Sequence, residues 1–190
     1  MRISILLIVL GLVYTACEQV RIIDENELIE FTFVKGEKLP YSGYSEEYYD
    51  NGNLRQEAFY KWGQLHGHFI EYYITGDRES EGEYIDGNRD GIWYHNEENT
   101  STHSEATFKN DRYHGSVIVW FDNGTREEVT FENGIMHGPY KSFYPNGAQE
   151  EESRYVDGDI HGLVTKWDEK GKKIYSGEYE KGKPVWNHTQ

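Results

Sequence analysis

The histidines are the residues that most readily suggest chemistry, because four of the eight occupy the same position of a repeated pattern. They are His66, His114, His137 and His161. Imidazole nitrogens bind zinc, so such a column could form a metal ladder. Successive β-hairpins lie about 10 Å apart, however, and zinc–nitrogen bonds are only about 2 Å long, so two members of the column cannot share one ion. We expect these histidines to be turn residues that precede a glycine.

Other routes to catalysis are weaker. His95 and His103 form a slightly better metal pair, but no third ligand is in place. The 34 acidic residues include Glu150-Glu151-Glu152, yet carboxylates this abundant indicate a solvated acidic face more than an acid–base pair. The sequence contains no Gly-x-Ser-x-Gly elbow and no Walker-type phosphate loop. We predict that the protein is not an enzyme and that it has no catalytic residue, cofactor or metal.

The net charge of −15 at pH 7 excludes two further classes of function. A nucleic-acid binder needs clustered Lys and Arg to neutralise phosphates. Docking on an anionic bilayer through a basic face needs the same excess of positive charge. We therefore expect no nucleic-acid partner, and membrane contact only through a lipid anchor.

The first residues have the pattern of a secretory signal. Arg2 gives a positive start, and an apolar run over residues 3–13 leads to Cys17, the only cysteine of the chain. The run is shorter than the ~20 residues needed to span a bilayer. A sole cysteine at this place resembles a bacterial lipoprotein signal, and this implies removal of residues 1–16, a lipid on Cys17, and a location in the cell envelope, at the outer membrane or cell surface. The alternative is an ordinary cleaved signal with an incidental cysteine.

The rest of the chain is one repeat. Glycines recur at Gly43, Gly67, Gly91, Gly115, Gly138 and Gly162, with spacings of 24, 24, 24, 23 and 24 residues. Extended aromatic and β-branched runs alternate with turn signals such as Asp122-Asn123-Gly124, which favour tight hairpin turns. We predict an all-β fold, an elongated single-layer antiparallel meander of about six tandem β-hairpins, with no helix of ordinary length.

Aromatic residues are expected to fill the core, because each ring can bury a large area and still reach water at its edge. Three columns recur through the repeats. The first is Tyr60, Tyr84, Phe108, Phe131, Tyr155 and Tyr179; the second is Tyr48, Tyr72, Asn96, Trp120, Phe143 and Trp167; the third is Ser45, Phe69, Trp93, Val117, Tyr140 and Val164.

The recurring frame of Tyr-Tyr, Asn-Gly, Tyr, Gly and His-Gly, as in Tyr48 to Gly67, resembles the MORN-type repeat proteins, specifically their bacterial variant repeats in the YwqK antitoxin-like family. The resemblance covers residue 43 to about residue 184. The third unit departs from the frame with Thr100 and Asp111 in glycine columns. This leaves open whether that unit forms a regular hairpin.

The predicted organisation is a signal peptide over residues 1–16, a tether and N-terminal cap over 17–42, six repeats over 43–186 and a tail over 187–190. Residues 27–34 are expected to add a capping strand. Tyr49, Tyr73, Phe121 and Tyr144 directly follow a core column, so they should point away from it and form a candidate binding surface. Alternatively, they cover a second face.

These observations predict a non-catalytic repeat scaffold or protein-binding module with an unidentified protein partner. The resemblance implies an alternative, an antitoxin-like neutraliser of a partner protein. Glycan binding ranks below these two functions, and a hydrolase with acidic catalysts ranks last.

Overall fold

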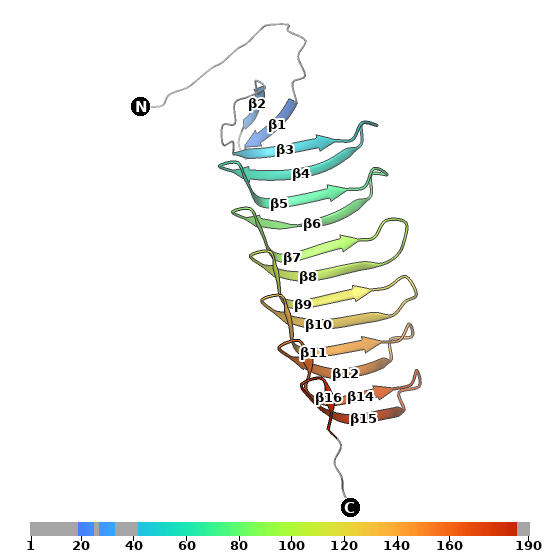
Figure 1. Cartoon of the computed structure of the whole chain (residues 1–190). Coiled ribbons are helices and arrows are strands. Elements are labelled where there is room, and N and C mark those ends of the chain that lie inside the picture. Colours follow the sequence, from blue (N-terminus) through green and yellow to red (C-terminus); the bar gives the residue numbers. More distant parts are fainter. Residues whose placement is uncertain (1–18, 25–26, 33–41, 186–190) are drawn as a thin grey trace, which may run out of the picture.

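The structure is a computed structural model that describes residues 19–24, 27–32 and 42–185. The predicted signal segment 1–16, Cys17 and the tail 187–190 lie outside these described residues. Within them the chain has no helix, and hence none long and apolar enough to cross a bilayer. One 14-stranded antiparallel sheet runs the length of the repeats, as Figure 1 shows.

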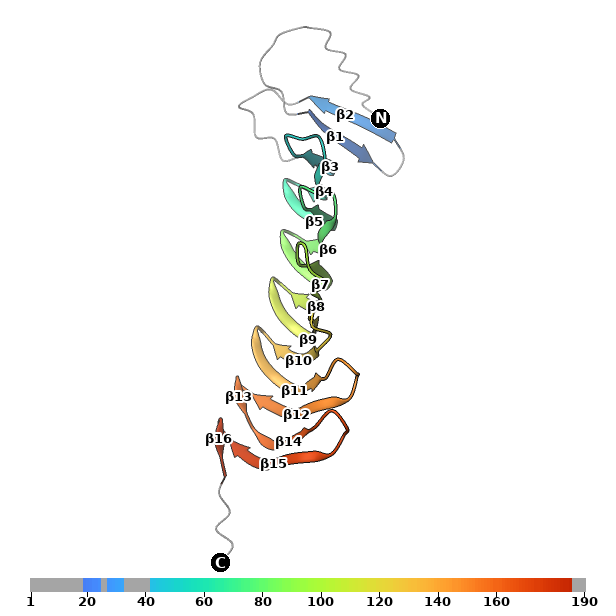
Figure 2. The ribbon, with the colours of Figure 1, turned by 90° about the vertical axis from the view of Figure 1, so that its right-hand side faces the viewer.

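Six β-hairpins follow one another along this sheet in chain order. Its strands are β3 (Gly43–Tyr48), β4 (Leu54–Lys61), β5 (Gln64–Tyr72), β6 (Arg78–Ile85), β7 (Asn88–Asn96), β8 (His103–Lys109), β9 (Arg112–Trp120), β10 (Arg126–Glu132), β11 (Ile135–Phe143), β12 (Gln149–Val156), β13 (Asp159–Ile160), β14 (Gly162–Trp167), β15 (Lys173–Glu180) and β16 (Lys183–Pro184). The predicted all-β meander of hairpin repeats is confirmed. Figure 2 shows each hairpin as an arc, so the stacked hairpins form a long curved strip.

Two different turns close the two ends of the strands. At the loop end, which closes each repeat hairpin, the Tyr49 N–H donates to the Asn53 carbonyl (2.8 Å) and the Gly52 N–H donates to the Tyr49 carbonyl (2.9 Å). At the tip end, which joins each hairpin to the next, two residues suffice; Asp86 and Gly87 have φ angles of 48° and 82°. Paired positive φ angles are typical of the type I′ turns that match strand twist. The predicted Asn-Gly turns are thus confirmed at the loop end, and the tip end is closed by shorter turns.

Four glycines of the column that marks the repeat, Gly67, Gly91, Gly115 and Gly138, lie inside strands, whereas Gly43 and Gly162 begin β3 and β14. Gly115 is the fourth residue of β9, with φ of 114°, and the β8–β9 register shifts between Ala106 and Phe108. His66, His114 and His137 are therefore strand residues, and the expectation that they are turn residues is wrong. His161 lies between β13 and β14. A positive φ is needed both in a turn and at such a bulge, so the residue type alone does not distinguish them.

The third repeat does form a hairpin. Asn96 pairs with His103, and the Glu97 N–H donates to the Thr102 carbonyl (3.0 Å), so this loop is one residue longer than the others. At the following tip, Asp111 adopts φ of 61° in place of the usual glycine.

The core is a single row of side chains that crosses the sheet. On each first strand the row carries a residue of the third column, such as Phe69 or Trp93, and on the second strand it carries a small residue, such as Ala58, Gly82 or Ala106. A Cβ on Gly82 would overlap the indole ring of Trp93. Large rings therefore lie over small neighbours, which lets a single layer bury them.

The three aromatic columns divide between two faces. We call the side that carries Ala58, Phe69, Trp93, Ala106, Phe108 and Val117 the core face. The first and third columns lie on it, because residues two apart on a strand share a face. The second column lies on the opposite side, which we call the outer face, where Tyr72 donates to Glu57 (2.6 Å). The prediction that all three columns fill one core is wrong for the second column.

The N-terminal edge of the sheet is covered. β1 (Gln19–Asp24) and β2 (Glu27–Thr32) form a separate two-stranded sheet, and β1 packs against β3. Of the strand predicted over residues 27–34, Glu27–Thr32 is present as β2, and residues 33 and 34 lie outside the described residues. The strand that packs on the first repeat is β1, which the sequence pattern did not predict.

Candidate binding surfaces

The predicted aromatic row lies at the start of the loops that close the hairpins. Tyr49, Tyr73, Phe121 and Tyr144 are all half-buried. Three of the four donate their hydroxyl to a backbone carbonyl of the next repeat: Tyr49 to Tyr72 (2.6 Å), Tyr73 to Asn96 (2.7 Å) and Tyr144 to Trp167 (2.9 Å). The row therefore joins consecutive hairpins at the loop end.

Phe121 occupies the same place in its loop without a hydroxyl. Its N–H and that of Gly124 make the same loop bonds as in the other repeats, at 2.9 Å each. These geometries give the hydroxyls of the row a part in joining repeats; the covered second face stays a prediction. That the ring faces also stack on a ligand stays a prediction.

The histidine column joins hairpins at the tip end. The backbone N–H of Asp86 donates to Nδ1 of His66 (3.3 Å), and that of Asn133 donates to Nδ1 of His114 (3.4 Å). His137 Nδ1 lies 3.5 Å from Asp157 Oδ1 in the corresponding place. Each of these residues reaches the first turn residue of the following tip, so the column serves the contact between repeats.

His95 and His103 are not brought together. His95 pairs with Ser104 and His103 pairs with Asn96 in the β7–β8 register, so the two imidazoles lie on opposite faces of the sheet. His103 stacks on Trp120 on the outer face, with ring centroids 4.9 Å apart. In the described part of the chain, no three His, Cys, Asp or Glu side chains are grouped to hold a metal ion.

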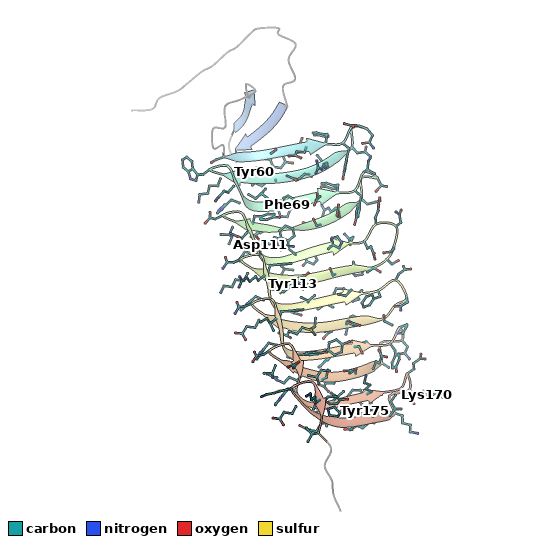
Figure 3. The ribbon with its side chains drawn as sticks, viewed as in Figure 1. Tyr60, Phe69, Asp111, Tyr113, Lys170 and Tyr175 are labelled. Carbon is teal, nitrogen blue, oxygen red and sulfur yellow. The ribbon has the colours of Figure 1, made fainter. Side chains whose placement is uncertain are left out.

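A hollow of about 390 Å³ opens on the core face between β5 and β9. We call it the core-face hollow. Phe69 and Trp93 form its aromatic walls, with ring centroids 5.7 Å apart, and Tyr84 contacts both rings edge-on at 5.2 and 5.0 Å. Figure 3 shows Phe69 over the middle of the sheet and Tyr113, which also lines the hollow, further along the array.

The tip end of the hollow holds a guanidinium group from the chain itself. The Arg89 guanidinium carbon lies 4.1 Å from the ring centroid of Phe108 and 5.7 Å from that of Trp93. Asp111 Oδ1 accepts from both the backbone N–H (3.0 Å) and Nε (3.1 Å) of Arg89. The aspartate that departs from the glycine column therefore anchors a stacked arginine.

The loop end of the hollow is acidic. Glu71, Glu79 and His95 line it, together with two small residues, Ser80 between Glu71 and His95 and Ser104 beyond His95. Burial, together with the neighbouring Glu79, raises the pKa of Glu71. This end therefore holds a carboxylate in a half-buried aromatic setting.

The outer face carries one glutamate on the second strand of five hairpins: Glu57, Glu81, Glu105, Glu128 and Glu152. Most of them are paired inside the chain. Tyr44 and Tyr72 both donate to Glu57 at 2.6 Å, and Arg78 lies 2.6 Å from Glu81. Burial and the bond to Glu57 raise the pKa of Tyr72 to about 12. The acidic face is thus partly neutralised.

Sequence reasoning missed the core-face hollow and its lining residues Arg89, Glu71 and Glu79. One signal was present. Arg89 stands where the other repeats have Leu65, Tyr113, Met136 and Ile160, and Asp111 replaces a glycine one repeat later. Arg89 and Asp111 both differ from their counterparts in the other repeats and contact each other, which indicates that this part of the array has a feature of its own.

Two stretches of the chain match the family model described as MORN repeat variant, residues 41–61 and 136–157. They correspond to the hairpins β3–β4 and β11–β12, and each begins two residues before a glycine of the repeat, Gly43 or Gly138. No curated protein matches the chain. The match supports a repeat scaffold or binding module and agrees with the open antiparallel sheet.

Proposed function

We propose that the protein is a non-catalytic, protein-binding repeat module, held in the bacterial cell envelope by a lipid on Cys17 at the outer membrane or cell surface. The support for binding is the core-face hollow, an opening of about 390 Å³ with aromatic walls and acidic residues at one end. Concave sites with apolar walls and a few charged groups are the usual form of a binding site. Repeat arrays also present extended surfaces to partners, since each repeat contacts only its neighbours.

The repeated units support the scaffold role because their recurring columns make contacts within the array itself. The tyrosine row and the histidine column both make contacts from one hairpin to the next. Such residues hold a surface in a fixed geometry and leave the hollow residues free to differ between repeats. Arg89 and Asp111 are one such local difference.

Capture of a partner from the native envelope tests the proposal. The full-length protein, carrying a photo-crosslinking residue in place of Ser104 in the hollow, is expected to crosslink to one or a few proteins. The matched control carries the same residue in place of exposed Ser116 on β9 and should not crosslink to them. Equal crosslinking from both positions would contradict a site in the hollow.

The same experiment separates the candidate roles. A captured protein that stops growth when expressed alone would identify an antitoxin-like neutraliser. Release of the captured material by glycan-degrading enzymes would identify a glycan ligand and would contradict the protein-binding proposal.

The lipid anchor has its own test. The sequence places the sole cysteine at the end of the apolar run, and this supports lipidation. Cys17→Ser should move the protein from the membrane to the soluble fraction, whereas Ser4→Ala should leave it with the membrane. Mass spectrometry of the wild-type N-terminus should find an acyl-modified cysteine; an unmodified one, with unchanged fractionation of Cys17→Ser, would overturn the anchor.

A further inference from the structure

The two ends of the core-face hollow share their chemistry but differ in what fills them. At the tip end, Arg89 lies on Phe108 and is paired with Asp111. At the loop end, the same hollow offers the rings of Phe69 and Trp93 and the carboxylates of Glu71 and Glu79. The loop end therefore has the wall and the counter-charge for a guanidinium, without one from the chain.

The charge at the loop end is not neutralised within the described residues. Neither Glu71 nor Glu79 has a Lys, Arg or His nitrogen within 4.0 Å among them. Arg55 and His95 act on Glu71 only at longer range, and Arg55 lies 3.8 Å from Glu47. Most carboxylates of the outer-face row, by contrast, have partners in the chain. A half-buried carboxylate without a partner favours a cationic ligand.

The shape of this end suits a long side chain. Ser80 on β6 pairs with Glu71 on one side and His95 on the other, and its small side chain leaves room between them. Ser104, also small, lies on the far side of His95. The stem of an arginine can pack on apolar walls while its planar head bonds a carboxylate in two places. Arginine also stacks on aromatic rings more readily than lysine does.

We propose that the loop end of the core-face hollow binds an arginine side chain of the partner protein, held by Glu71 and Glu79 against Phe69 and Trp93. This inference deepens the proposed function and rests on it. The ligand is a guanidinium presented by an exposed protein segment. The carboxylates determine the preference for a cation, and the ring walls determine the preference for a planar one.

A pair of isosteric probes tests the site. N-acetyl-arginine amide and N-acetyl-citrulline amide have nearly the same shape and differ in charge. Each is titrated into full-length protein labelled with ¹⁵N-tryptophan, and the Trp93 indole N–H, which donates to the Glu83 carbonyl at 3.1 Å, is the reporter. Its signal is assigned with Trp93→Phe. We expect a saturable shift with the arginine probe and at least tenfold weaker binding of the citrulline probe.

Charge-matched variants complete the test. The double variant Glu71→Gln and Glu79→Gln should lose at least tenfold in affinity for the arginine probe, while Glu128→Gln with Glu152→Gln on the outer face should stay within twofold. Equal binding of both probes, or arginine binding that survives Glu71→Gln with Glu79→Gln, would overturn the proposal. The proposal would also be overturned if calcium chloride shifted the Trp93 signal in the same way at a lower concentration than the arginine probe, since the site would then bind a metal ion.

The partner capture described above separates the two proposals. If the Glu71→Gln and Glu79→Gln variant still captures the same protein from the envelope, the arginine site is refuted and the binding module stands. If wild type captures nothing, the proposed function fails whatever the probes show.

Discussion

The indole ring of Trp93 lies over Gly82, in the space that a Cβ on Gly82 would occupy. The Trp93 indole N–H donates to the carbonyl of the next residue, Glu83, at 3.1 Å. The ring is thus fixed over the backbone of β6, and Trp93 as a whole residue is only 6% exposed. This contact places the aromatic wall of the core-face hollow, and it explains how one layer of sheet can bury a tryptophan.

Gly82→Ala is expected to destabilise the protein by about 1–3 kcal/mol, the usual cost of overpacking a core. In a Trp93→Val background the same substitution should cost much less, because a valine side chain is too short to lie over Gly82. Valine occurs at the equivalent positions Val117 and Val164. Urea unfolding of the four proteins in the cycle measures the coupling. Ser116→Ala on the exposed side of β9 is the control, and equal costs in both backgrounds would show that the ring does not depend on Gly82.

The tyrosine row predicts opposite effects at two equivalent positions. Tyr73→Phe removes a hydrogen bond to the Asn96 carbonyl and should cost about 0.5–1.5 kcal/mol. Phe121→Tyr should gain up to a similar amount, because its hydroxyl can reach the corresponding carbonyl of the next repeat. Thermal and urea unfolding of the two variants provide the measurement. If neither Tyr73→Phe nor Phe121→Tyr changes the free energy of unfolding, the tyrosine row does not stabilise the contact between repeats.

Replacing Glu71 by glutamine is expected to stabilise the protein by an amount that depends on pH. Burial and the negative charge of Glu79 raise the pKa of Glu71, with Glu47 adding to that effect and Arg55 and His95 opposing it. The folded state therefore binds the proton more tightly than the unfolded state, so the ionised carboxylate lowers stability at neutral pH. Glu71→Gln should raise the free energy of unfolding at pH 7, and the gain should shrink as the pH falls to about 4.

Urea melts between pH 7 and 4 provide the measurement, with Glu128→Gln on the outer face as the control. A loss of stability in Glu71→Gln at pH 7, or a gain that does not depend on pH, would contradict a desolvated and unpaired carboxylate at this site.

Much of the fold could be predicted because the sequence repeats one pattern in six consecutive units. Asn-Gly pairs and aromatic columns indicated hairpins, and the repeat spacing indicated their order. The roles of Gly115 and its equivalents could not be assigned, since turns and bulges both need positive φ. The face of Tyr72 was also missed, although Tyr72 follows Phe69 by three residues on β5 and regular alternation places residues three apart on opposite faces.

The candidate site was less accessible to sequence reasoning. Tyr49 and its equivalents were identified as a row, but the sequence does not show that their hydroxyls bond carbonyls 23 residues away. The hollow depends on a contact between Arg89 and Asp111 and on the small size of Ser80 and Ser104. Such features arise where one repeat differs from the others, and a repeat pattern shows only what the repeats have in common.

Deletion of one whole repeat tests the central claim most directly, namely that independent hairpin units form a scaffold for a site carried by β5 to β9. Removing residues 138–161 joins His137 to Gly162, which occupies the position of Gly138 one repeat later. The shortened full-length protein is expected to fold, with a lower urea midpoint and with the same affinity for N-acetyl-arginine amide within twofold. An unfolded product, or a folded one that has lost the probe, would contradict the account.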